Sequence, residues 1–370
     1  PDGKTISYNT RDGRLILRDV ATGKETLVVK SAWQATPTYD WSADSSTIAY
    51  LLAGDNLQNA LHLYDVATGK ATRVTDGFYS DDSVSFDLTG KYLYIASGRT
   101  FIPAQGAFEY MLNFGAPQRV YAIALTNDTT YPLATRPDEE PVKTEAPAQQ
   151  PPAAAGGGEP PKAPEKKSMR IDYEGLADRI MPLPFAPGNY GVVGLNNGLL
   201  VANQGGLIWF SFDTKQPIPI YQGPLAGAVF NEKRNKMAIA TGNGISIMNV
   251  APGQDPNAGR VSLARVEMMH DPRAEWKQIF WEGWRYQRDV FYDPNMLGLN
   301  WKAIGDQYAK YLPYVQHRND LNYLLGQLIG ELGTGHSYVG GGDVGPGVAA
   351  VPTAHLGADF VPEGNYVKIA

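Results

Sequence analysis

The stretch Asp19-Val20-Ala21-Thr22-Gly23-Lys24 decides the fold, because it recurs almost unchanged as Asp65-Val66-Ala67-Thr68-Gly69-Lys70. The second copy lies 46 residues after the first. Each copy follows a short run of alternating apolar residues and precedes another. The Ala-Thr-Gly-Lys portion carries the glycine that a tight hairpin turn requires. The sequence therefore predicts two hairpins of the same kind, one in each of two repeating units.

A second repeated element, a turn followed by a strand, runs in register with the first. Its copies lie at Pro1–Tyr8, Ala43–Tyr50 and Leu88–Tyr94. Four short strands that repeat at about 40–50 residues are typical of the blades of an all-β propeller. Further apolar runs, two of them around the turn Asn196-Asn197-Gly198, add later blades. We expect parts of about five blades in residues 1–265. Because the first blade looks cut, we expect a partial propeller that has seven blades in the whole protein.

Residues 136–168 interrupt the propeller pattern with a tract rich in Pro, Ala, Gly, Glu and Lys. This composition cannot bury enough apolar surface to fold. We expect a disordered, solvated insertion within the propeller, because blade-like sequence returns after it; an interdomain linker is the weaker alternative. We expect Met169–Pro187 to be an extended segment that re-enters the propeller.

The composition of the 370 residues bounds the class of protein. Hydrophobic residues make up 43% and charged residues 19%, which predicts two or three domains with a sizeable core. The net charge of −6 argues against a non-specific nucleic-acid binder. The absence of cysteine excludes disulfides, a thiol nucleophile and a thiolate metal site. No apolar run is long enough to predict a membrane span. Without an initiator Met or a signal peptide, we expect a fragment or a processed chain.

The apolar spacing becomes helical from Asp271 onward. Asp271-Pro272 marks the start of one helix, and a second begins near Trp301 and stops at Pro313. A third covers Leu321–Leu332. Three amphipathic helices predict a small, mainly α-helical subdomain over residues 266–343. Its aromatic residues fit a core better than a ligand site, and Arg285 and Arg288 fit the surface.

His336 directly follows the third predicted helix. Asn319 or Asp320 can cap that helix, and Gly333 suits a left-handed stop. A histidine just past a rigid helix end, beside small residues, is well placed to act on a substrate. A lone histidine in such a place is nevertheless more often a structural or capping residue. The glycine tract Gly340–Gly342 lacks a following helix, so it indicates a flexible exit rather than a phosphate loop.

The sequence predicts no metal site and no cofactor. The five histidines are scattered without ligand spacing, at His62, His270, His317, His336 and His355. Aspartates in the propeller turns are expected to be structural caps, with calcium binding as the less favoured alternative, at Asp40, Asp44, Asp81 and Asp82.

Several motifs of the helical region together resemble one family. The run from Glu275-Trp276 through Phe291-Tyr292-Asp293-Pro294-Asn295-Met296 to Gly333-Thr334-Gly335-His336-Ser337 is similar to the first core subdomain of tricorn-type serine peptidases. The order of parts also agrees with that family: propeller, helical subdomain, then a PDZ domain. On this resemblance, residues 344–370 are the start of a PDZ-like domain. The resemblance further implies a homo-oligomer, typically a hexamer, that degrades short peptides in the cytoplasm; a periplasmic or exported location is the alternative.

The resemblance assigns a role to a single residue of this chain. His336 matches the family histidine that acts as general base on a serine in a later segment. The serine and its acidic partner have no counterpart here, and the substrate-binding residues are unknown. Gly335 departs from the archaeal pattern, in which a serine assists; Thr334 or Ser337 could replace that hydroxyl. The rival reading is a non-catalytic propeller and PDZ protein that binds peptides or acts as a scaffold. The sequence beyond Ala370 would discriminate the two.

Overall fold

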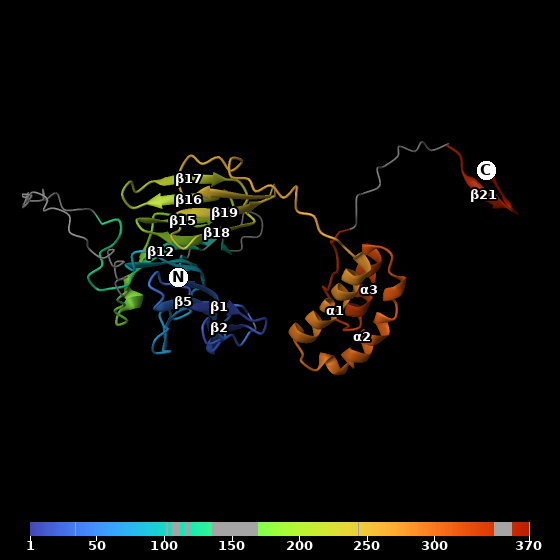
Figure 1. Ribbon diagram of the computed structural model, residues 1–370, viewed down its shortest axis with the longest axis horizontal. Helices are drawn as coiled ribbons and strands as arrows, with labels where there is room; N and C mark the ends of the chain where they lie inside the picture. Colours follow the sequence, from blue (N-terminus) through green and yellow to red (C-terminus); the bar gives the residue numbers. More distant parts are fainter. Residues whose placement is uncertain are drawn as a thin grey trace, which may run out of the picture. The chain divides into compact units, whose positions relative to one another are not determined.

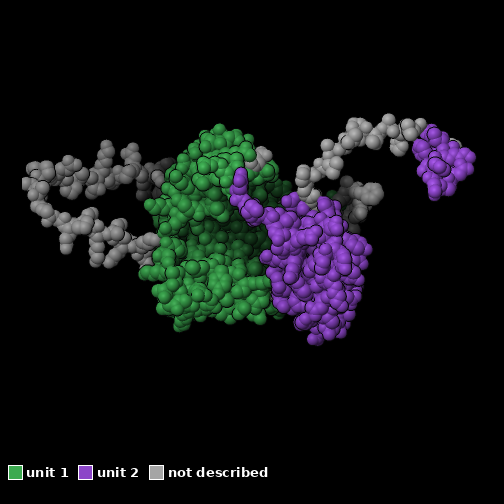
Figure 2. Space-filling view, turned by 45° about the vertical axis from the view of Figure 1, so that its right-hand side comes forward, with its two compact units in different colours: residues 1–266 green, residues 267–370 purple. Residues whose placement is uncertain are grey.

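The computed structural model describes residues 1–33, 35–100, 103–105, 112–114, 118–134, 169–242, 244–343 and 357–369. The chain separates into two units, residues 1–266 and residues 267–370 (Figures 1 and 2). Strands make up the first unit, and three α-helices followed by a terminal hairpin make up the second. Residues 136–168, where the insertion is predicted, and most of the segment that joins the helices to the hairpin lie outside the described residues.

The described strands of the first unit form five blade-like antiparallel sheets, which confirms the predicted propeller fold. The first two blades contain β1 (Thr5–Asn9), β2 (Arg14–Asp19) and β3 (Glu25–Lys30), then β4 (Thr38–Trp41), β5 (Thr47–Ala53), β6 (Asn59–Asp65) and β7 (Ala71–Arg73). The third contains β8 (Asp81–Phe86), β9 (Tyr92–Ser97), β12 (Arg119–Ala124) and β13 (Ile180–Pro182). The last two contain β14 (Gly191–Leu195), β15 (Gly198–Asn203), β16 (Gly206–Ser211) and β17 (Pro217–Gln222), then β18 (Gly227–Phe230), β19 (Lys236–Thr241) and β20 (Gly244–Asn249). A separate hairpin pairs β10 (Pro103–Gln105) with β11 (Leu112–Phe114).

The two copies of the repeated stretch fold into the same turn, as predicted. The backbone N–H and the hydroxyl of Thr22 both donate to Asp19 Oδ1 at 2.7 Å, and Thr68 contacts Asp65 in the same way. The glycine that follows each threonine has a φ near +70° (71° at Gly23), which a residue with a Cβ rarely adopts. These turns join β2 to β3 and β6 to β7.

The third blade is completed by a strand from beyond the predicted insertion. Its order is β13-β12-β9-β8, and Tyr121 pairs with Pro182 in the outer ladder. The expectation of a merely extended segment over Met169–Pro187 is therefore wrong, since it also holds a 3-10 helix, η1 (Leu176–Arg179). Its entry is fixed by Met169, whose N–H donates to Asp44 Oδ2 at 2.6 Å in the second blade.

Apolar side chains fill the space between neighbouring blades. Leu61, Phe86, Leu93 and Ile123 are fully buried in the cluster that joins the second and third blades. Burying one such side chain stabilises a fold by about 1.5–3 kcal/mol. A similar cluster around Phe210 joins the third and fourth blades. Packing between successive sheets, rather than within one sheet, therefore supplies the core.

Arg234, in the turn between β18 and β19, reaches into three other blades. Its Nη1 donates to Phe86 O at 2.6 Å and to Gly194 O at 2.8 Å, on β8 and β14. Its Nη2 donates to Asp40 Oδ2 at 2.9 Å on β4. The Arg234 side chain is only 13% exposed. One side chain of the fifth blade thus links the second, third and fourth.

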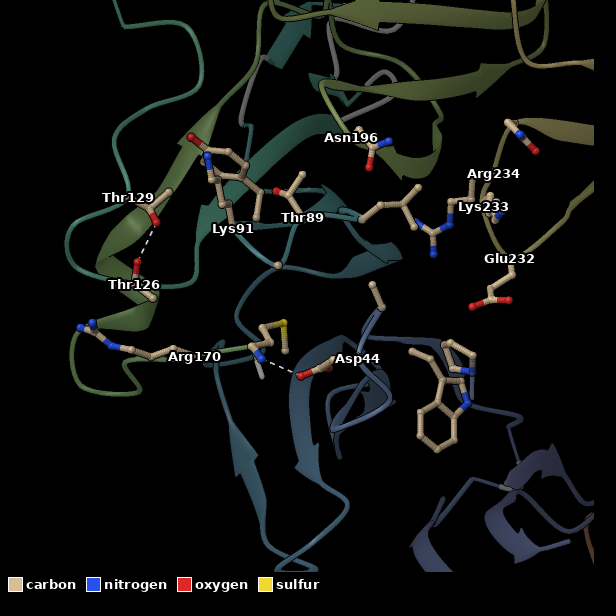
Figure 3. A pocket seen from close by; sticks show the side chains of 18 of the residues that line it. Asp44, Thr89, Lys91, Thr126, Thr129, Arg170, Asn196, Glu232, Lys233 and Arg234 are labelled. Atoms are coloured by element: carbon tan, nitrogen blue, oxygen red, sulfur yellow. Dashed lines mark hydrogen bonds between the residues drawn. The ribbon is translucent and has the colours of Figure 1, made fainter. Parts of the chain in front are cut away.

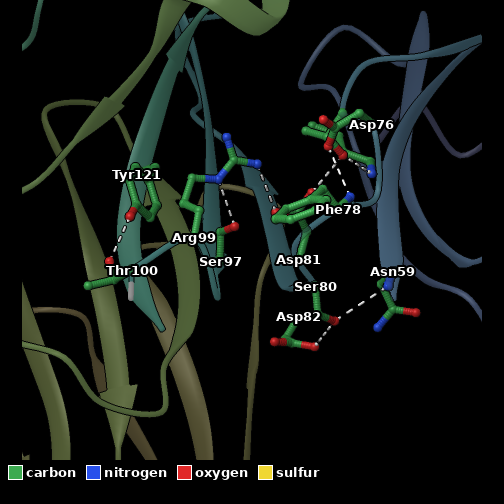
Figure 4. Close-up of polar contacts among 12 residues, drawn as sticks. Asn59, Asp76, Phe78, Ser80, Asp81, Asp82, Ser97, Arg99, Thr100 and Tyr121 are labelled. Atoms are coloured by element: carbon green, nitrogen blue, oxygen red, sulfur yellow. Dashed lines mark hydrogen bonds and ion pairs between the residues drawn. The ribbon is translucent and has the colours of Figure 1, made fainter. Parts of the chain in front are cut away.

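The aspartates expected to be turn caps serve different purposes. Asp44 is such a cap, since it accepts from Ser42 and Ser46. Asp81 is instead fully buried; it accepts from Thr75 Oγ1 at 2.7 Å and pairs with Arg99 at 3.3 Å (Figure 4). Asp40, as described above, lies in a strand and binds Arg234.

The second unit contains α1 (Pro272–Val290), η2 (Met296–Gly298), α2 (Trp301–Ala309), η3 (Leu312–Tyr314), α3 (Arg318–Gly330), β21 (Phe360–Glu363) and β22 (Tyr366–Ile369). Asp271 caps α1 as predicted, because its Oδ1 accepts from the N–H groups of Arg273 and Ala274. Trp284 and Trp301 each donate an indole N–H to the backbone oxygen of the other, at 2.8 and 3.0 Å. These bonds fasten α1 to α2.

The aromatic residues of the helices form a core, as expected. Phe280, Leu321 and Leu328 are fully buried there, with Trp301 4% exposed. The predicted surface role of the two arginines also holds. Arg285 pairs with Glu282, and Arg288 pairs with Asp289 and lies 5.1 Å from the centre of a Trp284 ring.

The predicted cap of α3 is wrong. Its N-cap is His317, whose Nδ1 accepts from the N–H of Asn319 at 3.2 Å. Asp320 completes a capping box, because its Oδ2 accepts from the N–H of His317 at 3.0 Å. The helix therefore starts about one turn earlier than its apolar spacing indicates, and the two side chains satisfy the N–H groups of His317 and Asn319.

Candidate functional site

The loop that carries His336 leaves α3 through a left-handed turn. Leu332 is 2% exposed in the helical core, and Gly333 follows it at φ +63°. This confirms the predicted left-handed conformation of Gly333, although α3 itself ends earlier, at Gly330. His336 itself has φ +61°, an uncommon value for a residue with a Cβ. Its side chain is exposed. The structure thus presents the imidazole to solvent from a constrained backbone.

The segment after His336 returns to α3. Val339 packs against the helical core. Gly341 O accepts from Asn322 Nδ2 at 2.9 Å, and Asn322 Oδ1 accepts from Arg318 Nε at 3.1 Å. The glycine tract Gly340–Gly342, which was expected to form a flexible exit, is bonded to the helix at Gly341. The His336 loop, defined as residues 333–341, is held at both ends.

The helix end that precedes the loop is held by a contact with α2. Tyr308 Oη donates to Glu331 Oε1 at 2.6 Å, and this hydrogen bond to a carboxylate raises the pKa of Tyr308 to about 12. At neutral pH the tyrosine therefore keeps the proton that makes the contact. This contact was not predicted, because sequence spacing alone does not bring α2 beside the end of α3.

The structure brings no catalytic partner to His336 within its described residues. Neither Thr334, which is half-buried, nor Ser337, which is exposed, forms a hydrogen bond with the imidazole there. The described histidines have separate surroundings: His270 pairs with Glu275 at 2.6 Å, and His317 caps α3. Across the same residues, no group of three potential His, Cys, Asp or Glu ligands could hold a metal ion.

His62 lies in the propeller, and its contacts indicate packing rather than catalysis or metal binding. It stacks on Tyr50 with ring centres 5.1 Å apart, and its Nδ1 is 3.0 Å from Ala60 O. Burial lowers the pKa of His62, and the nearby Arg73 adds to this effect, although the bond to Ala60 opposes it. His62 is therefore a packed, neutral side chain at pH 7.

A cavity of about 1330 Å³ opens at the propeller face where the first and second strands of successive blades are joined (Figure 3). Turns of the second to fifth blades line it, together with the chain around Thr126–Thr130 and Met169. Its charged lining residues are mixed in sign: Lys91, Arg170, Lys233 and Arg234 with Asp44, Asp128 and Glu232. The sequence did not predict this cavity, since its parts come from turns scattered along the propeller.

The acidic and basic groups of the cavity are partly used by the fold. Burial alone would raise the pKa of Asp44, but hydrogen bonds from Met169, Ser42 and Ser46 lower it. Arg170 pairs with Asp172 at 2.8 Å, and Arg234 with Asp40. A polar cavity with fixed charges of both signs can accept the backbone and the charged ends of a peptide.

Among the described residues, no helix is long and apolar enough to cross a membrane.

Two family models match the chain. Residues 1–212 match the model described as the tricorn protease second beta propeller domain, and residues 272–330 match the tricorn protease C1 domain. The first match covers the blades up to β16, and the second covers α1, α2 and α3 in full.

Curated relatives and a solved structure agree with these models. "Tricorn protease homolog 1" of Streptomyces coelicolor is 28% identical over 374 residues, which cover 92% of this chain and 33% of that protein. "Tricorn protease homolog" of Saccharolobus solfataricus is 22% identical, covering 91% of this chain and 31% of that protein. The crystal structure of the tricorn protease matches the fold with a TM-score of 0.71 at 20% identity, over all of this chain and 36% of that one. The chain thus spans about a third of the length of these relatives.

Proposed function

The chain belongs to the tricorn protease family, and from this premise we propose that it forms part of a serine peptidase that degrades short peptides. In this proposal His336 is the general base. The observation that carries it is the exposed imidazole on a loop whose two ends are bonded to the helical core. A side chain that must reach a group on another part of the protein needs a solvent-accessible ring and a backbone that is held in place.

The chemistry assigned to His336 is proton transfer. An imidazole nitrogen takes the proton of a serine hydroxyl as its oxygen attacks the peptide carbonyl, and later gives that proton to the leaving amine. We assign the serine and its acidic partner to parts of the protein other than these 370 residues. The assignment rests on the family and on the described surroundings of His336, where no hydroxyl or carboxylate is bonded to the ring.

The backbone at His336 adds support to a functional role. A residue with a Cβ held in the left-handed region costs of order 1 kcal/mol or more, and such residues cluster at functional sites. Histidine tolerates this region better than most residues do.

We further propose that peptides dock in the propeller cavity before cleavage, and that the protein works as a homo-oligomer of the hexameric kind. The mixed charges and the size of the cavity support the first part. The second part rests on the resemblance alone, and the mass of the protein in solution tests it. The cytoplasmic location stays a prediction.

The experiment that tests the proposal replaces His336 in a form of the protein that cleaves peptides. We choose His336→Asn, because asparagine also tolerates positive φ and so preserves the loop. The expected loss of kcat for a fluorogenic peptide is on the order of 10³-fold or more, because base and nucleophile act as a unit. The melting temperature should change little. The matched control is His270→Asn, at an exposed histidine of the same unit.

Two outcomes would contradict the proposal. A near-normal kcat for His336→Asn would show that the histidine is structural. A wild-type protein that binds peptides but never cleaves them would favour the non-catalytic binding or scaffold protein.

A further inference from the structure

A single side chain of α3 closes the His336 loop. Asn322 Nδ2 donates to Gly341 O at 2.9 Å, and Asn322 Oδ1 accepts from Arg318 Nε at 3.1 Å. Arginine only donates and a backbone oxygen only accepts, so the two partners fix which way the amide faces. Asn322 is half-buried. Its amide therefore ties the returning end of the loop to the helix in one orientation.

The backbone around Gly341 is shaped to receive this bond. Gly341 and Gly342 have φ values of +72° and +91°, which favour glycine. A Cβ on Gly342 would lie 2.4 Å from Arg318 Cζ, so the guanidinium packs directly against the glycine backbone. Asn322, Arg318 and the two glycines thus form one contact set, which we name the strap.

The strap acts on His336 through the loop. Leu332 and Gly333 fix where the chain leaves α3, and Val339 and Gly341 fix where it returns. His336 lies between these two anchors, where the described residues give its ring no bond of its own. The position of the imidazole is therefore set by the ends of the loop.

We propose that Asn322 is a positioning residue, which holds the His336 loop in the conformation that the base needs for proton transfer. The proposal rests on the proposed function for the role of His336. Asn322 touches no reacting atom, so it acts through the loop. Because a small displacement of a catalytic group lowers the rate of the chemical step, loss of the strap should lower kcat and leave KM nearly unchanged.

The sharpest variant is Asn322→Asp, which replaces the amide NH₂ by an oxygen at almost the same size. The carboxylate can still accept from Arg318, but it cannot donate to Gly341 O and instead repels it. The matched control is Asn319→Asp, which adds the same charge to an exposed residue of the same helix.

Two measurements test the proposal, and the first does not depend on catalysis. In the 370-residue chain we expect Asn322→Asp to lower the backbone NMR order parameters of residues 334–340, because the loop loses one of its two anchors. The His336 ring signal, assigned in the NMR spectrum by its loss in His336→Asn, should shift. In the peptide-cleaving form we expect kcat to fall about tenfold, with KM within about twofold. Asn319→Asp should match the wild type in every measurement.

The outcomes separate this proposal from the proposed function. Lower order parameters together with a lower kcat support the strap. Wild-type order parameters, or lower order parameters with wild-type kcat, overturn it. Failure of the proposed function is recognised separately, by a normal kcat in His336→Asn. The role of Asn322 in positioning a base then falls with it, even where the order parameters show that the strap holds the loop.

Discussion

At residue 336 the backbone conformation favours glycine, whereas the proposed function requires histidine. The φ of +61° penalises any Cβ, whereas the proposed chemistry needs an imidazole. Glycine removes the penalty and alanine keeps it, so we expect His336→Gly to be about 1 kcal/mol more stable to unfolding than His336→Ala. Urea unfolding of both variants measures the difference. Equal stabilities would show that the loop relaxes freely at this residue.

His317 is the residue whose role the sequence misjudged. The sequence indicated only that it is one of five scattered histidines, but it caps α3. We expect His317→Ala to destabilise the helical unit by about 1 kcal/mol, because the N–H of Asn319 loses its acceptor. His317→Asn, which restores a good cap, should recover most of the loss. Thermal unfolding compares the two, and an alanine variant as stable as the wild type would contradict the cap.

His62 gives the propeller a pH dependence with a definite sign. Its pKa is lowered in the folded state, chiefly by burial, so the unfolded chain binds the proton more tightly. Its contribution is therefore complete above the ordinary histidine pKa of about 6.5 and is lost as the pH falls toward the folded value. We expect the melting temperature of the wild type to fall more steeply between neutral and mildly acidic pH than that of His62→Gln. Parallel curves would show that His62 is not involved.

At the scale of elements, the turn that carries Arg234 joins four blades through one side chain. Arg234→Ala leaves Phe86 O and Gly194 O without this donor and Asp40 without its cation. We expect a loss of about 3 kcal/mol, because removing one partner of a largely buried ion pair strands the other. Asp40→Asn should cost less, since an amide oxygen can still accept from Arg234.

A double-mutant cycle of these two substitutions, followed by chemical denaturation, measures the coupling. The losses at two independent sites add to within a few tenths of a kcal/mol. We expect a coupling energy well above that value. Additive losses would mean that Arg234 acts through the backbone oxygens alone.

The elements differ in how far the sequence predicts them. The hairpins at Gly23 and Gly69 were predictable, because a local turn motif and flanking alternation repeat together. The strand β13 was not, since Ile180–Pro182 is three residues long and ends in proline. The α3 cap was missed because histidine is a rare cap and better candidates, Asn319 and Asp320, follow it.

The candidate site divides in the same way. The place of His336 after a left-handed turn at Gly333 follows from local sequence. The bond from Asn322 to Gly341 does not, because 19 residues separate them and only the return of the chain brings them together. The propeller cavity is likewise made by tertiary structure alone. Residues 344–370 as the start of a PDZ-like domain, and the seven-bladed count, stay predictions.

At the scale of the whole molecule, the two terminal blades leave apolar residues in solvent. Val229 of β18 and Ile247 of β20 lie across β19 in one row and are 69% and 54% exposed. In the first blade, Ile6 and Leu27 are each 54% exposed. We expect the 370-residue chain to self-associate through these surfaces as its concentration rises, because exposed apolar patches favour association.

The variant Val229→Ser with Ile247→Ser should reduce that association, and sedimentation velocity over a concentration series measures it. The control is Tyr323→Ser, at an aromatic residue of α3 that is 71% exposed. Association that persists unchanged in the double variant would locate it elsewhere.

The outer strand of the third blade, β13, is synthesised well after the strand that it pairs with, β12. A ribosome adds about 5–20 residues per second, so β13 follows β12 by roughly 3–10 seconds. During that interval the growing chain exposes the unpaired N–H and C=O groups of β12, which favour incorrect strand pairing between nascent chains. Lengthening the tract between the two strands would cost little equilibrium stability, since closure entropy rises only slowly with length. It would lengthen, in direct proportion, the time during which the outer edge of β12 stays unpaired.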